Sequence, residues 1–167
     1  MARRTFDVID ICEIFTHWYA GRSKNEIAVS LACSSTSACV AVGNCRDTSG
    51  AVQGLLLTGF GSSWTSLEAP LPTGAATSPS VRLASVACPS ASGCVVAGDY
   101  ADSEGNGQGL VLTGSGSSWA ATELPMPADA APNPDANLDS AACSSPTLCT
   151  LVGWCRLPRS WALVRIL

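Results

Sequence analysis

The stretch SVACPSASGCVVAG, residues 85–98, sets the pattern for most of the chain. Two cysteines six positions apart enclose a turn rich in Pro and Ser, and an aliphatic segment then runs to Gly98. The same arrangement occurs 55 residues earlier as SLACSSTSACVAVG (30–43) and 55 residues later as SAACSSPTLCTLVG (140–153). A fixed period of this length indicates an internal structural repeat.

The repeat extends beyond the cysteines. The segments QGLLLTG (53–59) and QGLVLTG (108–114) match, and so do GSSW at 61–64 and GSSW at 116–119. The third copy is shorter, and its final segment SWALVRIL (160–167) fits QGLLLT if the loop before it is about two residues shorter.

Each copy is typical of four short strands separated by turns of Gly, Ser, Asp and Pro. In the second copy we expect strands at 81–88, 94–100, 108–114 and 119–127. Four strands in a unit of about 50 residues correspond to one blade of a β-propeller. The sequence therefore predicts a mainly β chain, an incomplete β-propeller with two full four-stranded blades and a partial third. The units span 28–80, 81–135 and 136–167.

These motifs resemble the cysteine-bearing propeller-like repeats of actinobacterial extracellular proteins. That family carries a pattern like SVxCPSxSxCVAVG, then a polar loop, an aliphatic strand and GSSW. The resemblance covers residues from about 28 to 167 and implies a propeller architecture, without one activity common to the family.

The cysteine spacing predicts disulfides within each copy. Cysteines on adjacent antiparallel strands come within the roughly 4–7 Å Cα separation that a disulfide requires. The predicted pairs are Cys33–Cys39, Cys88–Cys94 and Cys143–Cys149, and we expect Cys12, Cys45 and Cys155 to lie outside them.

Two alternatives remain for the cysteines, which are buried thiols or a metal site. Cys-x₅-Cys-x₅-Cys occurs at 33-39-45 and 143-149-155, but zinc sites favour closer spacing, and Tyr100 replaces the third cysteine in the second copy. We therefore predict neither a metal nor a cofactor.

Three glycines and two tryptophans recur at fixed repeat positions and are predicted to be structural: Gly43, Gly98, Gly153, Trp64 and Trp119. The stretches LTGFGSSW (57–64) and LTGSGSSW (112–119) are similar to the Asp-box hairpin of sialidase-type propellers, with glycine where the Asp would stand. No catalytic residue is predicted. The acidic loop ADSEGN (101–106) suits loose Ca²⁺ binding, but its counterpart RDTSGA (46–51) has one acidic residue, so a repeated site is not expected.

The N-terminal segment, residues 1–27, has a helical pattern instead of the strand pattern of the repeats. Ile11, Ile14 and Phe15 share a helical face, and Ser23 to Glu26 forms a capping box that would open a second helix. A short N-terminal helical hairpin is the expected structure.

This segment, MARRTFDVIDICEIFTHWYAGRSKNEIA, resembles the N-terminal helix-turn-helix start of IstA-type insertion-sequence transposases. In that family a basic recognition helix follows. Here the next stretch, ACSSTSACVAVGNC (32–45), contains no Lys or Arg, so the resemblance is truncated. The alternative is a helix pair that covers a strand edge.

Composition limits the possible partners. The chain is 47% hydrophobic and 13% charged, with a net charge of −4, which is a poor match for a nucleic-acid backbone. We see no signal peptide and no membrane span, so the chain would be cytoplasmic if translated as given, although its repeats are of an extracellular type.

The sequence thus predicts a non-enzymatic β-propeller-type repeat module, a binding or scaffold fragment in a chimeric or truncated chain. Self-association or further repeats through open blade edges are the expected contacts. The alternatives are a DNA-binding transposase relic and a sialidase-like fragment without catalytic residues.

Overall fold

The computed structural model describes residues 27–35, 38–157 and 161–166, and all regular structure in these ranges is β-strand. The predicted helical hairpin, together with Cys12, falls in residues 1–26 and lies outside the described residues. The strands are β1 (Ile27–Ser35), β2 (Ala38–Arg46), β3 (Val52–Phe60), β4 (Ser63–Glu68), β5 (Arg82–Ser90), β6 (Gly93–Ala101), β7 (Gly107–Ser115), β8 (Ser118–Glu123), β9 (Asn137–Ser145), β10 (Leu148–Arg156) and β11 (Trp161–Ile166).

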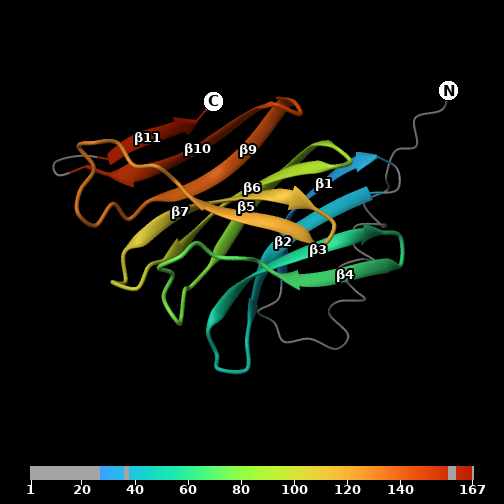
Figure 1. Ribbon diagram of the computed structural model, residues 1–167, viewed down its shortest axis with the longest axis horizontal. Coiled ribbons are helices and arrows are strands. Elements are labelled where there is room, and N and C mark those ends of the chain that lie inside the picture. Colours follow the sequence, from blue (N-terminus) through green and yellow to red (C-terminus); the bar gives the residue numbers. More distant parts are fainter. Residues whose placement is uncertain (1–26, 36–37, 158–160, 167) are drawn as a thin grey trace.

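The strands form three antiparallel sheets of four, four and three strands. We name them sheet 1 (β1–β4), sheet 2 (β5–β8) and sheet 3 (β9–β11). Within each sheet the strands lie side by side in chain order. Figure 1 shows the sheets following one another across the molecule. Strand β5 lies against sheet 1, and strand β9 lies against sheet 2.

Sheet 2 is buried on both faces, which explains its long aliphatic runs. One face contributes Val96, Leu110 and Leu112 to a core shared with Val40 and Val42 of sheet 1. The opposite face packs against sheet 3 through a second core that includes Ala97, Leu124, Leu138 and Leu151. Strands covered on both sides read as continuous hydrophobic segments rather than as alternating ones.

Two connecting segments, which we call straps, join successive sheets. The first strap (69–81) bonds to sheet 1 through Val81 N–H to Val52 O at 3.0 Å, and to sheet 2 through Ala76 N–H to Ala101 O at 3.0 Å. The second strap (124–136) repeats this pattern 55 residues later. Its bonds run from Ala136 N–H to Gly107 O and from Ala131 N–H to Arg156 O.

Both straps turn at a residue with positive φ just before they enter the next sheet. Ser80 has φ of 48° and Asp135 has φ of 43°. The residue before each turn, Pro79 or Pro134, accepts a backbone N–H from the following sheet. Each strap is therefore bonded to the sheet it leaves and to the sheet it enters.

Most strand ends of the second copy differ from the expected ones by one or two residues, and three other differences concern the layout of the repeats. The fourth strand of the second copy ends at Glu123 rather than at 127, because Leu124 N–H turns to bond Gly109 O at the start of the strap. In sheet 3 the loop 157–160 takes the place of 47–51, so it is one residue shorter rather than two. The first strand starts at Ile27, one residue before the predicted unit.

None of the described residues belongs to a helix that is long and apolar enough to cross a membrane.

Candidate functional site

Each sheet carries one disulfide across its first two strands. The Sγ atoms are 2.05 Å apart in Cys33–Cys39, 2.03 Å in Cys88–Cys94 and 2.07 Å in Cys143–Cys149. These are the pairs that the six-residue spacing predicts. Their Cα atoms lie 3.9–4.1 Å apart, because the first two strands of each sheet pair side by side at the cysteines.

The additional cysteines lie far from the disulfides. Cys45 and Cys155 stand six residues along a strand from Cys39 and Cys149, or about 20 Å at the usual rise per residue. The Cys-x₅-Cys-x₅-Cys pattern therefore does not gather three sulfurs at one point. Within the described residues no three His, Cys, Asp or Glu side chains are grouped as a metal site would require.

The repeat position of Cys45, Tyr100 and Cys155 contributes instead to side-chain packing. Cys155 is a fully buried thiol in the core shared by sheets 2 and 3, and burial raises the pKa of its thiol. Tyr100 takes the position in sheet 2. Its hydroxyl donates a 2.6 Å hydrogen bond to the Glu123 carboxylate, and burial, followed by this bond, raises the pKa of the phenol.

The repeated glycines allow close approach of a bulged strand. A Cβ at Gly98 would overlap the carbonyl oxygen of Arg82 and lie 3.1 Å from Leu83 Cα. The pairing then skips Ala84, so that Ser85 stands opposite Ala97, which is a β-bulge. The same register shift follows Gly43 in sheet 1 and Gly153 in sheet 3.

In β1 and β5, the serine that follows the bulge joins its sheet to the next one. Ser30 Oγ of β1 accepts the N–H of Val86 in β5 at 3.2 Å, and Ser85 Oγ of β5 accepts the N–H of Ala141 in β9 at 3.1 Å. Both β5 and β9 are edge strands, whose outward N–H groups have no partner within their own sheet. We call each of these contacts a serine junction.

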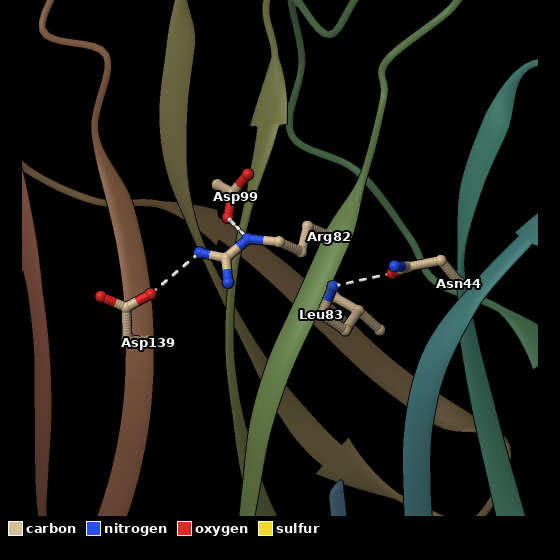
Figure 2. A network of polar contacts seen from close by, with 5 residues as sticks. All are labelled: Asn44, Arg82, Leu83, Asp99 and Asp139. Atoms are coloured by element: carbon tan, nitrogen blue, oxygen red, sulfur yellow. Dashed lines mark hydrogen bonds and ion pairs between the residues drawn. The ribbon is translucent and has the colours of Figure 1, made fainter. Parts of the chain in front are cut away.

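A second contact accompanies each junction, and it differs between the two. Between sheets 1 and 2, Asn44 Oδ1 accepts the N–H of Leu83 at 3.0 Å. Between sheets 2 and 3, the Arg82 guanidinium lies between two carboxylates, 2.8 Å from Asp99 and 3.1 Å from Asp139. Figure 2 shows both contacts around strand β5.

Asp99 is the most perturbed carboxylate of this network. It occupies the repeat position of Asn44, and burial raises its pKa to about 6 even though the neighbouring Arg82 charge favours ionisation. Burial opposes the charge on Arg82 as well, but the carboxylates of Asp99 and Asp139 outweigh it and raise the guanidinium pKa. Arg82 and Asp99 are thus partly buried, and their opposite charges stabilise each other.

Two aspartates organise the loops between the second and third strands. Asp102 accepts hydrogen bonds from the N–H groups of Glu104 and Asn106, both at 2.9 Å, and from Gln108 Nε2 at 2.9 Å. These bonds, that from Gln108 first, lower the pKa of Asp102 to about 2. The loop considered above for Ca²⁺ is therefore built around this carboxylate.

The first copy repeats the arrangement. Asp47 accepts the Nε2 group of Gln53 at 2.9 Å and the N–H of Ser49 at 2.8 Å, and its pKa is also lowered to about 2. Gln53 and Gln108 recur at the same repeat position, but no role for them is predicted from the sequence. The signal that would have found them is the Asp-x₅-Gln spacing at 47–53 and 102–108.

The two repeated tryptophans close hairpin turns. Trp64 donates its indole N–H to Gly61 O at 2.9 Å, and Trp119 donates to Gly116 O at 3.0 Å. The glycine in the Asp-box-like position faces each tryptophan across the hairpin, since a Cβ at Gly59 or Gly114 would lie 2.8 Å from the Trp Cα. These stretches thus use glycine for close strand approach where an Asp-box has a carboxylate.

Comparison of the chain with models of protein families, with curated proteins and with solved structures finds no match. The functional assignment therefore depends on the serine junctions, the straps and the polar networks described above.

Proposed function

We propose that the chain is a non-enzymatic repeat module of the β-propeller type, which acts as a binding or scaffold fragment. The observation that carries this proposal is the serine junction, which occurs twice with the same atoms and the same 55-residue register. A structure that adds sheets by an identical contact is suited to presenting a surface rather than to enclosing one reactive centre.

The order of the strands supports the propeller type. Each sheet is an antiparallel meander, and a strap leads from the last strand of one sheet to the first strand of the next. Propeller blades are four-stranded units of this kind, arranged around an axis. Under this proposal β1, β5 and β9 are the innermost strands.

The use of the polar side chains supports a role without catalysis. Asp47 and Asp102 hold loops through backbone amides and a glutamine, and Arg82 bridges two sheets through Asp139. General acid–base catalysis needs a titrating group directed at a substrate. In the described ranges, the carboxylates with strongly shifted pKa values, Asp47, Asp99 and Asp102, are directed at the chain's own backbone and side chains.

Two assays test this proposal against its alternatives. Incubation with a fluorogenic sialoside should give no turnover above that of buffer, and a gel shift at low salt should show no retardation of duplex DNA. Low salt is the stringent condition, because phosphate contacts strengthen as ionic strength falls.

A positive result in either assay has a specific meaning. Saturable hydrolysis would refute the non-enzymatic assignment and favour the sialidase-like alternative. Retardation that disappears with rising salt would instead favour the transposase alternative, which depends on the resemblance of residues 1–27. A variant with Arg3 and Arg4 changed to Ala would then test whether that segment is responsible.

A further inference from the structure

The two serine junctions form a series with an open position at each end. In both junctions the acceptor serine and the donor amide are 56 residues apart, as in Ser30 with Val86 and Ser85 with Ala141. Continued by one step in each direction, the series assigns the next acceptor to Ser140 and the preceding donor to the amide of Leu31.

Ser140 is available as an acceptor. It follows the bulge of β9 as Ser85 follows that of β5, since the pairing skips Asp139 between Leu138 and Ser140. Ser140 is exposed, and its hydroxyl makes no hydrogen bond in the part of the chain that the structure describes. On the same strand, Asn137 Oδ1 is buried and has no donor among the residues that the structure describes.

Leu31 is available as a donor. It pairs with Ala41 as Val86 pairs with Val96, so its amide faces the open edge of β1 in the same way. Its side chain is 42% exposed, whereas the equivalent Val86 is 6% exposed because sheet 1 covers it. Within the described residues, Leu31 thus lacks the neighbour that covers Val86.

We propose that a second copy of this chain binds head to tail, with its β1 edge on the exposed face of β9. Leu31 N–H of one copy donates to Ser140 Oγ of the other, and the Leu31 side chain packs where Val86 packs within the chain. Two copies can exchange both contacts, because each carries one Leu31 amide and one Ser140 hydroxyl.

A second copy is preferred to another partner because the contact continues an interface that the chain already makes twice. Each molecule presents one half of the junction at Leu31 of β1 and the other half at Ser140 of β9. The contact is small, because Ala41, Leu55 and Leu57 on the rest of this face of sheet 1 are already buried. We therefore expect weak association, with a dissociation constant of about 10 µM or weaker.

Sedimentation velocity of the full chain, from low to high micromolar concentrations, tests the proposal. The mass should rise from 17.0 kDa toward twice that value as concentration increases. Ser140→Lys blocks the acceptor surface and Leu31→Lys blocks the donor surface, so each variant alone should stay monomeric. Circular dichroism of each variant confirms that it is folded.

An equimolar mixture of the two variants gives the decisive measurement. Each variant keeps the surface that the other has lost, so the mixture should associate more than either variant alone, and more weakly than the unmodified chain because one junction replaces two. The matched controls are Phe60→Lys, which removes another exposed apolar side chain (45% exposed), and Ser117→Lys in an exposed turn. Both controls should associate as the unmodified chain does.

Three outcomes would overturn the inference: a monomer at every concentration, association that both blocking variants leave unchanged, or a mixture that associates no more than either variant alone. The inference rests on the proposed repeat module, but the two fail separately. Sialoside turnover or DNA retardation would refute the module without changing the oligomer, and a monomer would refute only the head-to-tail contact.

Discussion

Replacing Gly98 with alanine should destabilise the protein strongly, because the added methyl group has no space. It would overlap Arg82 O and crowd Leu83 Cα, and both are backbone atoms that no side-chain rotation can move away. Strand β5 would have to separate from β6 at this point. The bulge that directs Ser85 at sheet 3 would be lost with it.

The size of the effect follows from two contributions. Overpacking typically lowers the free energy of unfolding by about 1–3 kcal/mol. Gly98→Ala lies at the upper end of that range, because the added methyl group would meet the backbone of β5. Loss of the Ser85 junction adds about 1 kcal/mol. For a chain of this length, a total of about 3–4 kcal/mol lowers Tm by roughly 6–16 °C.

Thermal unfolding followed by circular dichroism, together with urea titration, measures this loss. Gly93→Ala is the matched control, because a Cβ there would meet only Ser90 Oγ at 3.4 Å. That substitution should be neutral or stabilising by up to about 1 kcal/mol, since it restricts the unfolded chain. If Gly98→Ala unfolds within about 0.5 kcal/mol of Gly93→Ala, a measurable difference by this method, the close approach does not require glycine.

Three further predictions concern the disulfides and the aspartates. Replacing Cys88 and Cys94 together with alanine should lower the free energy of unfolding in urea by about 2 kcal/mol on the loop-entropy model; no change would show that the bond constrains nothing in the unfolded chain. The pKa of Asp99 is raised to about 6, so the native state binds this proton more tightly and stability should fall as pH rises from about 4 to about 6. Asp99→Asn should remove that slope from a series of urea titrations, and a slope that persists would assign it to another group. The pKa of Asp102 is lowered to about 2, so its contribution is present above about pH 4 and lost as pH falls toward 2. Asp102→Asn should flatten part of this acid-induced loss in thermal melts, with Asp47 retaining the rest, and an unchanged acid limb would contradict the assignment.

The strands and the disulfide pairs could be predicted because they depend on residues close together in the sequence. A cysteine pair around a short turn, or a glycine opposite a bulge, recurs wherever the same strand pair recurs. The 55-residue register therefore placed Cys88 and Gly98 in equivalent surroundings to their counterparts. Strand ends were less certain, since the fourth strand stops where a strap forms its first bond at Leu124.

The contacts between sheets could not be predicted in the same way. Ser85 reads in the sequence as one small residue in an alternating strand, and only the bulge turns its hydroxyl toward Ala141. Arg82 and Asp139 are 57 residues apart, and nothing in their local sequence relates them. From the sequence alone, the straps are predicted as strand ends that contain prolines. The positive φ at Ser80 cannot be predicted, because serine is not a residue typical of that conformation.

The uniform spacing of the straps has a consequence for how such a gene can change. A strap bonds to the sheet on either side through the same four backbone contacts each time, and none of these contacts depends on a side chain. An in-frame duplication or deletion of 55 codons would therefore keep the register of these four contacts. Such an array would gain or lose whole sheets without a change in the backbone bonds that hold each strap.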